Sequence, residues 1–338
     1  RFYKQTLTVS MQIYNVIMPL KAEREVNMRK TTKRRLSSLL CAVLMLVTSI
    51  DVTAFAAESK ASKRKIDVWD MGTVQEADTD KYNNHITAAD WENCDNVSKD
   101  GKFVAGETTF GDLTINHNAN DRLFSASGKN YGSNALATTA YDDGYTASGI
   151  YYCNGTGGET RRNVTINNVI AGDKIVVYMA SSNAATGTLV FKYLGQDNEQ
   201  VEKASFTNKG AKYEFVAKYS GSYKVYTDAA AGKPIYNRIV RIPGVAVSGT
   251  IDGAQLSGYK VMFKDEANGI TYDADIKGNT FTATLAAGCD YTAVLSGVAG
   301  YGFSNDTKNI STTVDEALTG KSGVTLSIEE KKVYTYTG

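Results

Sequence analysis

Alternating apolar and polar positions dominate the chain from Asn163 onward. The alternation runs through short segments that are separated by turn-forming groups such as Ala171-Gly172-Asp173 and Ser220-Gly221. A period of two residues places every second side chain on the same face of a strand, so the pattern predicts strands that bury at least one face. The predicted strands are NVTINNVI (163–170), KIVVYMA (174–180), TLVFKYL (188–194), KYEFVAK (212–218), SYKVYT (222–227) and YNRIVRI (236–242).

Closely spaced strands without a long helical period predict an all-β fold class made of two antiparallel β-sandwich domains. The one helical pattern is a turn or two around residues 86–92. Pro234 and Pro243 flank the last of these strands, and a new alternating run begins after Gly244. We therefore predict a first sandwich over 66–243 and a smaller one over 244–330. Residues 331–338 would begin a linker or a further domain, and we expect the chain to be a fragment.

The second predicted unit begins with VSGTIDGAQLSGYKVMFKD and contains tight-turn signals at Asp252-Gly253 and Lys277-Gly278-Asn279. Its order of motifs, V-x-G-x-I, then G-x-x-V-x-F, then N-T-F-x-x-x-L and Y-T-A-V, resembles small transthyretin-like or fibronectin-like sandwiches. Such sandwiches occur as spacers in surface and secreted enzymes, and the resemblance implies a spacer role for this unit alone.

The N-terminal region has the pattern of a targeting segment. Basic residues from Arg29 to Arg35 precede an apolar run over 36–50, and Ala54-Phe55-Ala56 offers a small-x-small cleavage site. The run is too short for a transmembrane helix. We predict a signal peptide over 28–57, a linker over 58–65, and a location that is secreted or at the cell surface.

Residues 1–27 precede the predicted start at Met28, and we interpret them as an untranslated or mis-started segment. Arg24 to Asn27 can be encoded by a purine-rich ribosome-binding sequence, which points to a bacterial gene.

Charge and cysteine content narrow the classes of function. The formal net charge is +1 and both signs are interspersed, so no field strong enough to recruit nucleic acid is expected. After the signal peptide the chain keeps Cys94, Cys153 and Cys289. Either Cys94 and Cys153 form a disulfide, or all three are unpaired and largely buried thiols.

Motifs of catalysis are missing from the sequence. It has no G-x-S-x-G elbow, no H-E-x-x-H, no C-x-x-C and no phosphate-binding glycine loop. We predict no catalytic residue, and whether the parent protein is an enzyme stays open. Asp142 and Asp143 are candidate ligands of a structural calcium ion, because clustered carboxylates on an irregular loop suit a hard cation; solvated turn acids are the alternative.

The segment SGIYYCNGTGGETRRNV offers a candidate glycan site. Sugar recognition commonly uses an aromatic plate with fixed polar donors, and arginine can hold a uronate carboxylate with two hydrogen bonds. Neighbours in a strand point to opposite faces, so only one tyrosine and one arginine of each adjacent pair can serve the same rim. The alternative is a hairpin whose inner tyrosine lies in the core. We expect Trp69 to be a half-buried anchor and Trp91 to be exposed. The candidate ligand-binding residues are Trp91, Tyr145, Tyr151, Tyr152, Arg161 and Arg162.

The order of motifs over 66–243 resembles a known family. V-W-D-M-G (68–72), K-Y-N-N-H-I-T (81–87), A-G-D-K-I-V-V-Y (171–178) and G-K-P-I-Y-N-R-I (232–239) are similar to the N-terminal β-sandwich modules of large secreted pectate lyases and pectinesterases of gut Firmicutes. The resemblance implies that a catalytic domain lies elsewhere in the parent protein, while this part targets it to pectin-like polysaccharide.

Our hypothesis from the sequence is thus the non-catalytic targeting portion of a secreted, multidomain, polysaccharide-degrading enzyme. Its expected partner is an acidic plant cell-wall polysaccharide, with no nucleic acid and no membrane once the signal is cleaved. The alternative is a cell-surface adhesin or a structural stalk without glycan specificity.

Overall fold

The computed structural model describes residues 64–125, 134–182, 186–195, 200–228 and 233–331. The segment predicted as mis-started (1–27), the predicted signal peptide (28–57), most of the linker and residues 332–338 lie outside the described residues. In the described part of the chain, no helix is both long and apolar enough to cross a membrane.

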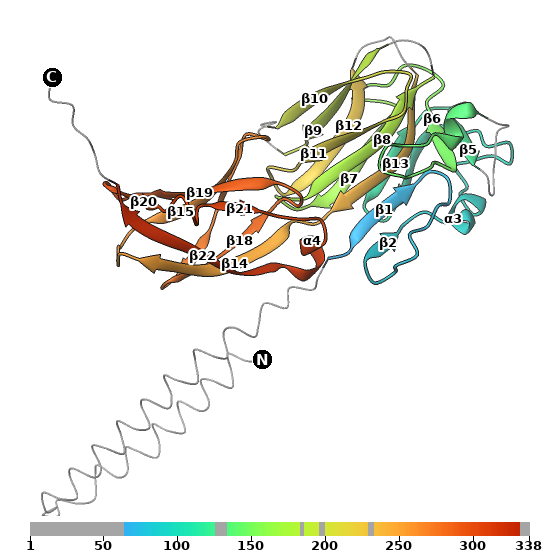
Figure 1. The fold of residues 1–338 in the computed structure, drawn as a ribbon. Helices are drawn as coiled ribbons and strands as arrows, with labels where there is room; N and C mark the ends of the chain where they lie inside the picture. The colour runs from blue at the N-terminus through green and yellow to red at the C-terminus, as the bar shows by residue number, and fades with distance from the viewer. Residues whose placement is uncertain (1–63, 126–133, 183–185, 196–199, 229–232, 332–338) are drawn as a thin grey trace, which may run out of the picture. The chain divides into compact units, whose positions relative to one another are not determined.

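Strands β1 to β13 form a first sandwich of two sheets, which confirms the all-β fold class (Figure 1). One sheet has seven strands, with β11-β8-β13-β1-β2 as its main order; β6 pairs with β13, and β5 pairs with β6. These strands are β1 (Ile66–Asp70), β2 (Tyr82–Asn84), β5 (Arg122–Ser125), β6 (Gly149–Tyr152), β8 (Lys174–Ser181), β11 (Ala211–Val216) and β13 (Pro234–Ile242). The other sheet has six strands in the order β10-β9-β12-β7-β4-β3. They are β3 (Gly106–Phe110), β4 (Leu113–His117), β7 (Asn163–Val169), β9 (Gly187–Tyr193), β10 (Val201–Phe206) and β12 (Gly221–Asp228).

The alternation in the sequence accounts for the core between these sheets. Strand β8 directs Ile175, Val177 and Met179 inward, where they join Phe191 of β9 and Val225 of β12 in one buried cluster. Every residue of β8 is buried, so its second face is covered as well. A central strand of this kind is apolar on both sides, which is why KIVVYMA is the most continuous apolar run of the region.

Strands β14 to β22 form a second sandwich of a five-stranded and a four-stranded sheet (Figure 1). Strand β13 ends at Ile242 and β14 begins at Val245 in a different sheet, so the change of sheet falls at the predicted junction. The larger sheet contains β14 (Val245–Gly253), β17 (Asp275–Lys277), β18 (Thr280–Leu285), β20 (Tyr301–Phe303) and β22 (Lys321–Glu330). The smaller contains β15 (Lys260–Asp265), β16 (Ile270–Asp273), β19 (Asp290–Ser296) and β21 (Asn309–Ser311).

Most neighbouring strands are antiparallel, as predicted, but β1 pairs with β2 and β14 with β22 in parallel. Three short helical turns interrupt the described strands, and the first of them lies where the sequence predicts a turn or two. They are α3 (Ala88–Glu92), the 3-10 turn η1 (Ala135–Thr138) and α4 (Glu316–Thr319).

The structure shows whether Cys94 and Cys153 form a disulfide, which the sequence leaves open. Cys153 is fully buried and carries a free thiol, so it forms no disulfide with Cys94. Burial raises the pKa of the Cys153 thiol well above its ordinary value, which keeps the sulfur protonated and unreactive. Cys153 therefore acts as a small core residue.

Candidate functional site

Trp91 lies in the core, and its predicted exposure is wrong. The Thr87 hydroxyl accepts a hydrogen bond from the Asp90 backbone N–H, and the Asp90 carboxylate accepts one from the Thr87 backbone N–H. This capping box fixes the orientation of the single helical turn α3. The fully buried indole donates from Nε1 to the Met71 carbonyl at 3.1 Å and packs edge-to-face on Phe110. No face of the ring is open to a ligand. Trp69 is fully buried too, deeper than the half-buried position expected.

Tyr151 and Tyr152 of β6 point to opposite faces, as the alternation predicts. Tyr151 is fully buried in the core between the sheets, and its ring stacks on Tyr236 with centroids 5.8 Å apart. Tyr152 packs in a smaller cluster on the other face with Phe124 and Ile235. Both rings are covered by neighbouring side chains, which matches the alternative of a hairpin whose inner tyrosine is core.

Arg161 and Arg162 also separate. Arg161 is exposed, whereas the Arg162 guanidinium donates from Nε to the fully buried Asp121 carboxylate at 2.8 Å. The same carboxylate accepts hydrogen bonds from the backbone of Asn118 and Asn154 and from the Tyr151 hydroxyl. Arg162 therefore neutralises an internal charge, and its predicted ligand-binding role stays a prediction.

Tyr145 and Asp143 lie together at a depression of about 510 Å³ on the outer face of the seven-stranded sheet. This volume is within the range of about 300–1,000 Å³ that is usual for small-molecule sites. The sequence thus found two of the lining residues, although it assigned them to different roles. Most of the charged lining comes from strands, as does Tyr178: Lys174 and Tyr178 belong to β8, Lys212 and Glu214 to β11, and Arg238 to β13, whereas Glu76 lies before β2.

Strand register builds the floor of this depression. Val176 of β8 is paired with Val240 of β13, and Ile66 and Ile242 line the same surface. Val314, from the second sandwich, also contributes to the lining. The next row of the same face carries polar groups in the cross-strand order Lys212, Tyr178, Arg238 and Asp70. The result is an aliphatic floor beside a polar row.

Tyrosines hold the buried Arg238 at one side of the depression. Its guanidinium lies over the Tyr145 ring, 4.7 Å from the centroid, and 6.0 Å from that of Tyr178. It also forms an ion pair with Glu76. The Tyr145 hydroxyl donates to Asp70 at 2.7 Å, so the 139–147 segment is tied down over the sheet. Cation–π contact and ion pairing together fix the arginine in one orientation.

Ion pairs form the opposite side. The Lys212 ammonium lies 3.0 Å from Glu214 and 3.7 Å from Asp143, and Lys174 lies 3.4 Å from Glu214. Asp143 also accepts a hydrogen bond from the Tyr178 hydroxyl at 2.7 Å. Burial raises the pKa of Asp143, but the Tyr178 bond and the Lys212 charge outweigh it and the pKa is lowered. The rim therefore presents carboxylates and ammonium groups side by side.

The calcium ligands predicted at Asp142 and Asp143 stay a prediction. Asp142 is exposed, and the Lys212 ammonium already lies against Asp143. Within the described ranges, no group of at least three His, Cys, Asp or Glu side chains is placed to hold a metal ion.

Asp70 gives the site a pH-dependent element. Burial raises the pKa of Asp70 to about 6, although the Tyr145 hydrogen bond and the Arg238 charge lower it. The folded state then binds more protons than the unfolded chain between pH 3.8 and about 6, so this group's contribution to stability falls as the pH rises through that window.

We expect Asp70→Asn to remove this loss. The variant should be more stable than the wild type by ~2–3 kcal/mol at pH 7, and the difference should vanish near pH 4, in urea denaturation of the full chain. Asp143→Asn is the control and should destabilise the protein at pH 7, because the pKa of Asp143 is lowered. The stabilisation by ionised Asp143 is lost only as the pH falls below the ordinary pKa of aspartate. Equal stability of Asp70→Asn and wild type at every pH would contradict the assignment.

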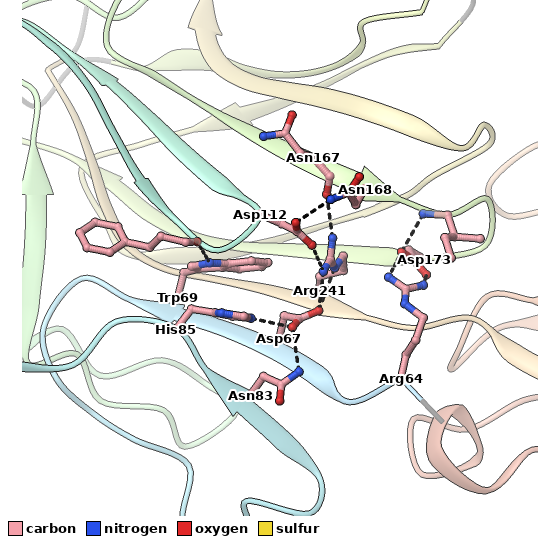
Figure 2. Close-up of polar contacts among 12 residues, drawn as sticks. Arg64, Asp67, Trp69, Asn83, His85, Asp112, Asn167, Asn168, Asp173 and Arg241 are labelled. Atoms are coloured by element: carbon pink, nitrogen blue, oxygen red, sulfur yellow. Dashed lines mark hydrogen bonds and ion pairs between the residues drawn. The ribbon is translucent and has the colours of Figure 1, made fainter. Parts of the chain in front are cut away.

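A second polar cluster lies inside the first sandwich (Figure 2). Arg241 of β13 is placed between Asp67 of β1 and Asp112, with nitrogen–oxygen distances of 2.7 Å to both carboxylates. His85 bonds to the other oxygen of Asp67 at 2.7 Å and stacks on the Trp69 ring at 4.9 Å. Two carboxylates share one guanidinium, and the stacked rings of His85 and Trp69 lie beside them, so we interpret the cluster as structural.

Comparison with known proteins adds little to this geometry. No family model matches the chain, and no curated relative matches it either. Among solved structures it is similar to xylanase10C from Cellvibrio japonicus in complex with xylopentaose, at 10% identity, TM-score 0.21, over 38% of this chain and 31% of that chain. It is also similar to the glycoside hydrolase domain of Endo-D from Streptococcus pneumoniae, at 11% identity, TM-score 0.20, over 52% of this chain and 34% of that chain. Likeness at this level supports no conclusion about function.

Proposed function

We propose that the first sandwich binds a polysaccharide in the depression on the outer face of its seven-stranded sheet. In this proposal the chain is the non-catalytic targeting portion of a secreted bacterial enzyme that degrades plant cell-wall polysaccharide, and the second sandwich is a spacer. A pectin-type substrate is the form of this proposal that the sequence resemblance suggests. The observation that carries it is the aliphatic floor of Val176 and Val240 beside a row of fixed donors and acceptors.

A pyranose ring presents an apolar C–H face and a rim of hydroxyls. The valines of the floor can cover the apolar face, and the ring hydroxyls can bond to Lys212, Glu214 and Asp143 at the rim. Because Arg238 and Tyr178 are already held by their neighbours, these side chains lose little conformational entropy when a ligand binds. Such a site binds without any catalytic group, in agreement with the missing catalytic motifs.

The test is affinity electrophoresis of the full chain through gels that contain plant cell-wall glycans. The double variant Lys212→Ala/Glu214→Ala removes both members of a rim ion pair and leaves no charge of that pair unmatched. We expect about tenfold weaker retardation, since two modest hydrogen bonds are worth ~1.4 kcal/mol together.

The matched control removes an exposed pair from the other sheet, Lys203→Ala/Asp228→Ala, whose nitrogen–oxygen distance is 3.4 Å. It should migrate like the wild type in every gel. Equal retardation of the two double variants would place the binding surface elsewhere. Unchanged mobility of the wild type in all glycans would favour the adhesin or stalk alternative.

A further inference from the structure

The charged groups that line the depression are balanced. The cations are Lys174, Lys212 and Arg238, and the carboxylates are Glu76, Asp143 and Glu214, so there is one carboxylate for each cation. A site that selects a polyanion has to offer cations in excess, because each acidic sugar brings a full negative charge. The lining residues do not supply such an excess.

Each lining cation is also already paired. Arg238 is bound to Glu76, Lys212 lies 3.0 Å from Glu214, and Lys174 lies 3.4 Å from the same carboxylate. A uronate group that bonds to one of these cations meets the protein carboxylate that already holds it, so two negative charges share one positive charge in a partly buried place. Their repulsion, or the displacement of the protein carboxylate, cancels most of what the new ion pair gains.

A further negative charge lies beside the arginine on the neighbouring strand. Asp70 is 2% exposed, is the cross-strand partner of Arg238, and accepts the Tyr145 hydrogen bond. At neutral pH this carboxyl is mainly ionised, because its pKa is about 6. Counted with the charged lining residues, Asp70 gives four carboxylates to three cations, an excess of negative charge that repels a polyuronate.

Neutral sugars bring no charge that competes for these ion pairs. Every hydroxyl is both a donor and an acceptor, so neighbouring hydroxyls can bond to the ammonium of Lys212 and the carboxylate of Glu214 while that pair stays formed. The aliphatic floor of Val176 and Val240 is indifferent to charge and contacts the C–H face of the ring.

Resting on the proposed glycan-binding function, we infer that the depression selects a neutral polysaccharide and discriminates against polyuronates. This departs from the acidic partner that the sequence suggests. That expectation relied on the resemblance to pectin-degrading enzymes and on Arg161 and Arg162, and the structure places Arg162 on Asp121 inside the protein.

The experiment compares homogalacturonan with its carboxyl-reduced form, which has the same backbone without the charges, in affinity gels of the full chain at pH 7. Neutral xylan, galactan and glucomannan complete the panel. We expect retardation by at least one neutral polymer at both low and high salt, since no ion pair to the ligand would be screened. The retardation by homogalacturonan should be weaker than that by the best neutral polymer, by about tenfold or more.

The variant Glu214→Gln leaves Lys174 and Lys212 without their shared carboxylate. Homogalacturonan should retard this variant about threefold more than the wild type, and high salt should abolish the difference. Asp228→Gln, at an exposed ion pair of the other sheet, is the control and should show no gain.

Strong, salt-sensitive retardation of the wild type by homogalacturonan alone would overturn the inference and leave the proposed function in place. Failure of every glycan to retard the chain would overturn both.

Discussion

Replacement of Arg241 by leucine should lower the free energy of unfolding by about 3–5 kcal/mol. Its guanidinium donates to Asp67 from Nε at 2.9 Å and from an Nη at 2.7 Å, and it also reaches Asp112 and the Asn167 carbonyl (Figure 2). The side chain of Asp67 is 7% exposed, so removal of the cation would leave a carboxylate in a place that water barely reaches. Denaturation of the full chain in urea at pH 7 measures the loss.

Two companion variants separate the ion pair from general damage. Lys203→Leu changes an exposed cation, 57% accessible, and should alter stability by about 0.5 kcal/mol or less. The double variant Asp67→Asn/Arg241→Leu should recover part of the loss, because the stranded charge is gone. A loss below about 1 kcal/mol for Arg241→Leu would show that Asp67 and Asp112 find other partners.

The same effect has a predictable pH dependence. Burial raises the pKa of Asp67, but hydrogen bonds from His85 and Arg241 outweigh it, so the pKa is lowered. Because its pKa is lowered, ionised Asp67 stabilises the folded state at a pH above 3.8, the pKa of the unfolded chain. This stabilisation is lost as the pH falls through the pKa of the folded state. Wild type and Arg241→Leu should therefore converge in stability as the pH drops below about 4.

Most strands in the second half of the first sandwich could be predicted because they are long and either alternate or are apolar on both faces. Strand β12 alternates buried and half-buried side chains over much of its length, and β8 is buried throughout. In the first half, β2 has three residues and β5 has four, which is too short for a period of two to be distinguished from chance. The fold class was thus predictable where single strands were not.

Most of the candidate site could not be predicted, because pairing between distant strands assembles it. Strand β13 shows the difficulty most clearly. Simple alternation would put Tyr236 and Arg238 on the same face, but a register shift between them turns Tyr236 into the core and Arg238 to the outer face. A bulge changes the direction of one side chain relative to the next, and the sequence carries no clear signal for it. Tyr145 was predicted since it belongs to a conspicuous tyrosine-rich loop.

The second large effect is expected for Arg162→Ala, which should destabilise the protein by about 3 kcal/mol without acting on a ligand. The Asp121 carboxylate is 0% exposed, and Arg162 supplies its cation. The backbone at Arg162 has φ +52°, a left-handed conformation that disfavours residues other than glycine. Alanine at this position would have the same unfavourable backbone conformation, but it would lack the ion pair that stabilises it.

Arg161→Ala is the matched control, one residue away and exposed to solvent. Both variants should be measured twice, by urea denaturation for stability and by affinity electrophoresis for glycan binding. If Arg162 has the ligand-binding role that the sequence suggests, its alanine variant will lose retardation while its unfolding midpoint stays that of the wild type. The buried salt bridge predicts the reverse for folded Arg162→Ala, with retardation kept and the midpoint lowered, and it predicts no change in either measurement for Arg161→Ala.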